Sequence, residues 1–77
     1  MKLEIFFGSV VNGEYVLNPE PVAVAETSPR GILVSGDSSF LDGLPLETVD
    51  ESEQQVALKR LADSFSSASL ARTRIDT

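Results

Sequence analysis

Cysteine and histidine are both absent from this sequence of 77 residues. Without cysteine the chain has no disulfide and no thiolate that could act as a nucleophile or a metal ligand. Without histidine it has no imidazole base, so Ser-His-Asp and Cys-His catalytic sets and zinc sites with nitrogen or sulfur ligands are excluded. We therefore expect a protein that is not an enzyme and that holds no cofactor.

Long apolar runs are missing as well. No segment approaches the roughly 18–20 consecutive apolar residues that a membrane-spanning helix requires. The residues after Lys2 are mostly apolar, but Glu4 interrupts them and no small-residue cleavage site follows. These observations predict a cytoplasmic protein that makes no contact with a membrane.

Basic residues are scarce: 6 lysines and arginines stand against 12 aspartates and glutamates, for a formal net charge of −6. In residues 37–53 every charged residue is acidic, while residues 54–77 are slightly basic. Direct binding to nucleic acid needs a basic surface, so we expect none. The acidic segment either keeps the protein soluble and complements a helix dipole, or docks on a basic partner. Docking would make candidate contact residues of Asp37, Asp42, Asp50 and Glu51.

The remaining composition is that of a small globular domain, with 42% hydrophobic and 23% charged residues. Chains of this length bury only about 60% of their unfolded surface, close to the lower limit for folding without a disulfide or a metal. We expect one domain over residues 1–77, made of strands (1–36), a loop (37–47), a helix (48–72) and a loose tail (73–77).

Residues 48–72 have the pattern of one long amphipathic helix. Apolar residues recur three or four positions apart and form a stripe on one face, namely Ala57, Leu58, Leu61, Ala62, Phe65 and Ala68. Two capping boxes compete at the start, Thr48 with Glu51 and Asp50 with Glu53. A helix with one apolar face needs a surface to lie on, and the preceding strands supply that surface.

Several short segments before the helix have strand patterns. Residues 2–7 alternate in polarity, and residues 10–17 contain Asn12-Gly13, a strong signal for a hairpin with a type I′ turn. Residues 22–25 and 32–35 are two further short apolar strands. The predicted fold class is therefore α+β: a small antiparallel meander of three to four strands, starting with a β-hairpin, with one long C-terminal helix packed on the sheet.

The hairpin can pair in two ways. A regular two-residue turn pairs Val10 with Tyr15 and places Tyr15 and Leu17 on the face opposite the apolar side chains of residues 2–7. A bulge at Gly8-Ser9 would bring both sets to one face, since glycine inside a strand often marks a bulge. We favour the bulge.

Residues 36–46 are predicted to form a loop, because they contain two glycines, a proline and two aspartates. The loop's apolar residues are expected to seal one end of the core: Phe40, Leu41, Leu44 and Leu46. Asp37, Ser39 and Asp42 resemble part of a calcium loop, but the spacing lacks the alternating carboxylates and final glutamate of an EF-hand. We interpret them as turn and cap residues and predict no metal site.

Apolar side chains point to both faces of the predicted sheet, although one helix can cover only one of them. We expect Ile32 and Val34 on the covered face. The open face is assigned Phe6, Ala23, Ala25 and Leu33, joined by Tyr15 and Leu17 if the hairpin is regular. Either residues 36–46 fold over this face, or scattered apolar groups stay exposed, or a partner binds there. If a partner binds there, the expected contact residues are Phe6, Tyr15, Leu17 and Leu33.

The function that these patterns favour is a non-enzymatic interaction subunit, assembling through the apolar sheet face as a homo-oligomer or within a larger complex. An alternative is an acidic inhibitor, of the kind that phages encode, in which residues 37–53 block a basic, nucleic-acid-binding surface of a target protein. A third is a subunit that lends carboxylates to a shared active site. Salt separates the first two hypotheses, since it weakens a charged contact far more than an apolar one.

Overall fold

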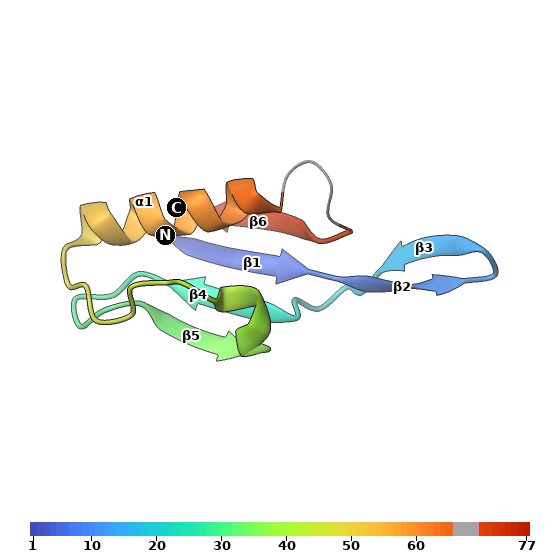
Figure 1. Cartoon of the computed structure of the whole chain (residues 1–77), viewed down its shortest axis with the longest axis horizontal. Helices are drawn as coiled ribbons and strands as arrows, with labels where there is room; N and C mark the ends of the chain where they lie inside the picture. The colour runs from blue at the N-terminus through green and yellow to red at the C-terminus, as the bar shows by residue number, and fades with distance from the viewer. Residues whose placement is uncertain (66–69) are drawn as a thin grey trace.

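The structure, a computed structural model, describes residues 1–65 and 70–77 (Figure 1). Within these residues the chain is an α+β fold of one α-helix, one 3₁₀ helix and six strands in two antiparallel sheets. The elements are β1 (Lys2–Phe6), β2 (Gly8–Val11), β3 (Glu14–Leu17), β4 (Ala23–Glu26), β5 (Leu33–Gly36), η1 (Ser38–Leu41), α1 (Glu51–Ser64) and β6 (Arg72–Asp76). The predicted α+β class is confirmed. The predicted meander of three to four strands with one long C-terminal helix is wrong, since the strands form two sheets and β6 follows a shorter helix.

The main sheet has the strand order β5-β4-β1-β6, so β1 lies in its interior between β4 and β6. Residues 73–77 were expected to be a loose tail, and this prediction is wrong. Ala71, Thr73 and Ile75 alternate with charged residues, and this period of two suits a strand. Pairing with β1 over its whole length then satisfies the backbone of both strands.

The helix is 14 residues long, so the prediction that it extends over residues 48–72 is wrong. At its start Asp50 is the cap, accepting hydrogen bonds from the backbone N–H groups of Ser52 (2.8 Å) and Glu53 (3.4 Å). The later of the two competing capping positions is therefore the one used. At its end the Ser64 hydroxyl donates to the Leu61 carbonyl (2.6 Å), a side-chain bond that competes with helix continuation. Ala68 lies outside the described residues.

The core lies between α1 and one face of the main sheet (Figure 1). Its buried side chains are Leu3, Ile5, Ala23, Ala25, Ile32, Leu41, Leu58, Ala62 and Ala71. The predicted helix stripe is confirmed at Leu58 and Ala62, whereas Ala57, Leu61 and Phe65 are half-buried at its edge. The stripe also includes Gln54, a fully buried polar residue that the apolar pattern passed over.

The predicted sheet faces are partly reversed. Register pairs Leu3 with Ala25 and Ile5 with Ala23, and directly opposed residues share a face. Ala23 and Ala25 are therefore fully buried under the helix, and the prediction that they lie on the open face is wrong. Leu33 does lie on the open face, 58% exposed.

The segment between β5 and α1 packs on the same face as the helix. Leu41 is buried in the core, and Phe40 and Leu44 pack against it, as expected. Leu46 is exposed, so its predicted role as a seal is wrong. The Phe40 ring lies between the rings of Phe7 and Phe65, with centroid distances of 5.6 and 6.2 Å. Since these contacts are on the helix side, the segment does not cover the open face of the sheet.

The β2–β3 hairpin extends from one end of the main sheet and gives the molecule an elongated shape, 45 × 21 × 21 Å (Figure 1). Its register is regular, Val10 opposite Tyr15, so the favoured bulge at Gly8-Ser9 is wrong. The break in the ladder falls at Phe7 instead, where the chain passes from β1 to β2 and changes pairing partners. The φ angles of Asn12 (52°) and Gly13 (81°) are both positive, as a type I′ turn requires.

Candidate protein-interaction site

The open face of the main sheet is largely polar, which contradicts the expectation of an apolar face. One cause is β6, which places Arg72, Arg74 and Asp76 there, level with the even-numbered residues of β1. Arg74 Nε donates to Glu4 Oε1 (2.9 Å), and its guanidinium carbon lies 5.9 Å from the centroid of the Phe6 ring. One arginine therefore covers a buried carboxylate and a half-buried aromatic ring.

Phe6 and Leu33 do not form one patch. Leu33 lies on β5 opposite Glu26, which in turn lies opposite Lys2, so Leu33 belongs to a row of charged residues at one end of the sheet. Phe6 lies at the other end of β1, opposite Arg72. The two candidate contact residues are thus separated along and across the strands.

The apolar surplus is found on the hairpin instead. Its exposed apolar residues are Val10 (68%), Val11 (50%), Val16 (49%) and Leu17 (39%). Register and alternation divide the hairpin into two faces. One has Gly8, Val10, Tyr15 and Leu17, and the other, here called the outer face, has Ser9, Val11, Glu14 and Val16. Apolar groups therefore point to solvent on both sides of a two-stranded ribbon.

Tyr15 fixes the hairpin to the body of the protein. Its hydroxyl oxygen accepts a hydrogen bond from the Gly8 backbone N–H (2.9 Å), and the hydroxyl donates to the Leu70 carbonyl (2.8 Å). Its ring meets the Phe7 ring edge to face, with centroids 6.3 Å apart. Tyr15 thus uses its polar end within the chain, while Leu17 next to it on the same face stays exposed.

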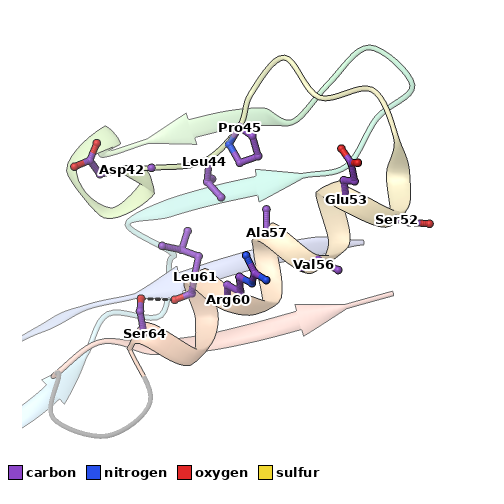
Figure 2. A pocket seen from close by; sticks show the side chains of 11 residues that line it. Asp42, Leu44, Pro45, Ser52, Glu53, Val56, Ala57, Arg60, Leu61 and Ser64 are labelled. Atoms are coloured by element: carbon purple, nitrogen blue, oxygen red, sulfur yellow. Dashed lines mark hydrogen bonds between the residues drawn. The ribbon is translucent and has the colours of Figure 1, made fainter.

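A groove runs between α1 and residues 42–45 (Figure 2). It is open to solvent, with a volume of about 710 Å³. Its apolar lining consists of Leu44, Pro45, Val56, Ala57 and Leu61. Figure 2 shows Leu44 and Pro45 on the loop side and the other three on the helix side. Ala57 leaves the groove open because its side chain ends at Cβ.

Charged side chains stand along the rim of this groove. Asp42 and Glu53 lie at opposite ends in Figure 2, and Arg60 lies between them. In the part of the chain that the structure describes, none of the three has a charged partner. The groove can therefore hold an apolar segment and offer it one cation and two carboxylates at the edge.

The acidic candidates are all exposed but serve different purposes. Asp37 caps η1, and hydrogen bonds from the Ser39 hydroxyl (2.7 Å) and the Ser39 backbone N–H (3.0 Å) lower the pKa of its carboxyl group. Asp50 caps α1. Asp42 lies at the groove, and Glu51 in the first helical turn. Among the described residues no group of acidic side chains is arranged to hold a metal ion.

Sequence reasoning missed the groove and the exposed valines on the outer face of the hairpin. The signals were present but weak: alanine at position 57 inside an apolar stripe, and Gly43 and Pro45 in the facing segment. Neither signal identifies a groove until the two segments are known to face one another.

No protein-family model, curated protein or solved structure matches this chain. The helix that the structure describes is too short and too polar to cross a membrane. A proposal for the function must therefore be based on the surfaces described above.

Proposed function

We propose that this protein is a non-enzymatic, cytoplasmic interaction subunit and that the hairpin is its contact element. The observation that carries the proposal is the exposure of Val10, Val11, Val16 and Leu17 on an arm outside the main sheet. The sequence patterns predicted a contact on the main sheet, but charged residues occupy most of its open face.

A two-stranded ribbon that stands apart from the main sheet has little stability of its own. A two-stranded hairpin alone is marginally stable in water, and its outer edges leave backbone groups unpaired. A partner that covers the four exposed apolar side chains would remove their surface from water. This burial favours binding by about 25 cal/mol for each Å² of apolar surface. Exposed apolar patches ordinarily mark a protein–protein contact, and each face of the hairpin exposes two apolar side chains.

The test is a variant with charge on both hairpin faces, Val10→Asp with Val16→Asp. Wild type and variant would be compared by light scattering and as bait in an extract of the cells that express the protein. We expect wild type to self-associate or to retain a partner, and the double variant to lose that contact while keeping its circular dichroism spectrum.

The matched control is Val49→Asp, which adds charge at an exposed valine outside the hairpin and should change neither result. If the double variant keeps the same partners and the same mass as wild type, the hairpin is not the contact element.

A second candidate function is the acidic inhibitor, favoured by the exposure of all six acidic residues in 37–53. Asp37 and Asp50 are poor test positions because their carboxylates cap η1 and α1. Asp42→Asn with Glu51→Gln removes charge without removing a cap. For an inhibitor, this variant should bind its basic target more weakly and with a shallower salt dependence than wild type. If the two substitutions leave binding unchanged, and salt does not weaken it, the inhibitor function is rejected.

A further inference from the structure

In the part of the chain that the structure describes, apolar side chains are exposed on the outer face of the hairpin and along the groove beside α1. We infer that these two surfaces fit one another between two copies, so that the hairpin of one copy docks in the groove of the second. This inference rests on the proposed function, because it takes the hairpin as the contact element and identifies its partner as another molecule of the same chain.

The hairpin cannot fill the groove of its own chain. It extends from one end of the sheet, whereas α1 lies along the body of the molecule (Figure 1). The hydrogen bond from the Tyr15 hydroxyl to the Leu70 carbonyl and the packing of the Tyr15 ring on Phe7 hold the hairpin in this direction. Contact between the two surfaces therefore requires a second copy.

The dimensions of the two surfaces agree. The helix between Ser52 and Ser64, which forms one wall of the groove, rises about 18 Å at 1.5 Å per residue. A four-residue strand such as β2 is about 13 Å long. Val11 and Val16 of the outer face would meet the apolar lining, and the width left open at Ala57 gives room for their side chains.

One pair of charges is complementary as well. Glu14 lies directly opposite Val11 on the outer face, and Arg60 stands in the middle of the groove rim. Neither has a charged partner among the residues that the structure describes. Docking the outer face brings this carboxylate to this guanidinium, a local attraction between two copies that each have a net charge of −6.

Docking in both directions closes a symmetric pair in which each copy gives its hairpin and receives one, the closed arrangement that most homo-oligomers adopt. Light scattering over a concentration series should then give twice the mass of the 8.3 kDa chain. Val16→Asp on the hairpin and Val56→Asp in the groove should each give a monomer.

Mixing these two variants is the decisive experiment. The Val16→Asp copy keeps an intact groove and the Val56→Asp copy keeps an intact hairpin, so the mixture should form a heterodimer through one contact. Reassociation also shows that both variants are folded. Val11→Asp, on the same outer face, is the second hairpin variant and should behave like Val16→Asp.

Val49→Asp is the matched control, since Val49 is an exposed valine outside both the hairpin and the groove lining. It should leave the dimer intact. Exchange of the charged pair adds a second check. Glu14→Arg or Arg60→Glu alone should raise the dissociation constant up to about fivefold, and the double variant should recover most of the loss.

Three results would overturn the inference: a wild-type monomer at every concentration, a mixture of the two variants that stays monomeric, or equal loss of the dimer in Val49→Asp and Val16→Asp. A wild-type monomer that still retains another protein through its hairpin would overturn only this inference and leave the proposed function standing.

Discussion

Replacing Leu58 by alanine is expected to lower the free energy of unfolding by about 2–5 kcal/mol. Leu58 is fully buried in the middle of α1, where it belongs to the same cluster as Leu3 and Ile5 of the central strand. Truncation removes apolar contacts and leaves a cavity that the sheet cannot fill. A domain of this size has roughly 4–11 kcal/mol of stability in total, so the loss would populate the unfolded state measurably.

Leu61→Ala is the matched control, because Leu61 is a leucine one turn further along the helix that lines the groove and is only half-buried. Its truncation should cost less than about 2 kcal/mol. Urea or guanidinium melts of both variants measure the difference. Equal losses for the two leucines would mean that α1 is rotated about its axis relative to the orientation described above.

Replacing Gln54 by alanine should cost about 2–4 kcal/mol, although the residue is polar. Its side chain is fully buried and makes three hydrogen bonds to backbone groups. Gln54 Oε1 accepts from the Ser28 N–H (3.0 Å), and Nε2 donates to the carbonyl oxygens of Ser28 (2.9 Å) and Thr48 (2.6 Å). Alanine leaves these three groups without their partner, and part-buried groups gain little from water in return.

The neighbouring Gln55→Ala variant separates this effect from a general loss of glutamine in the helix, since Gln55 is only half-buried. It should stay within about 0.5 kcal/mol of wild type. Amide hydrogen exchange at Ser28 offers a second measurement: its protection should fall in the Gln54 variant and persist in the Gln55 variant. If Ser28 exchanges at the same rate in both, the buried glutamine does not hold the turn that precedes β5.

The parts of the fold that sequence predicted are those decided by neighbouring residues. Asn12-Gly13 specifies its turn because both residues accept positive φ, and the regular register follows from a two-residue connection. Asp50 was one of two candidate caps, and local chemistry was enough to identify both. Leu58 and Ala62 follow from the helical period alone.

The errors have non-local causes. The face of the sheet that each β4 side chain occupies depends on the register between β4 and β1. The connection through residues 18–22, which contains two prolines, does not specify that register. The predicted helix includes the start of β6, because Ala71 and Arg72 are compatible with either a helix or a strand. Pairing with the edge of β1 that β4 leaves open favours the strand. The candidate site was predicted least well, because the groove exists only where α1 meets residues 42–45.

The pairing of β6 with β1 also has a consequence for how the chain is made. Lys2 lies opposite Asp76, so the two strands that meet in the sheet are synthesised about 74 residues apart. At about 5–20 residues per second, β1 would wait roughly 4–15 s before β6 emerges. During this interval one long edge of β1 has no partner, and an unpaired edge is a template for pairing with other nascent chains. Aggregation should therefore compete with folding most strongly during synthesis, and slower translation of the residues between β4 and β6 should lower the soluble yield.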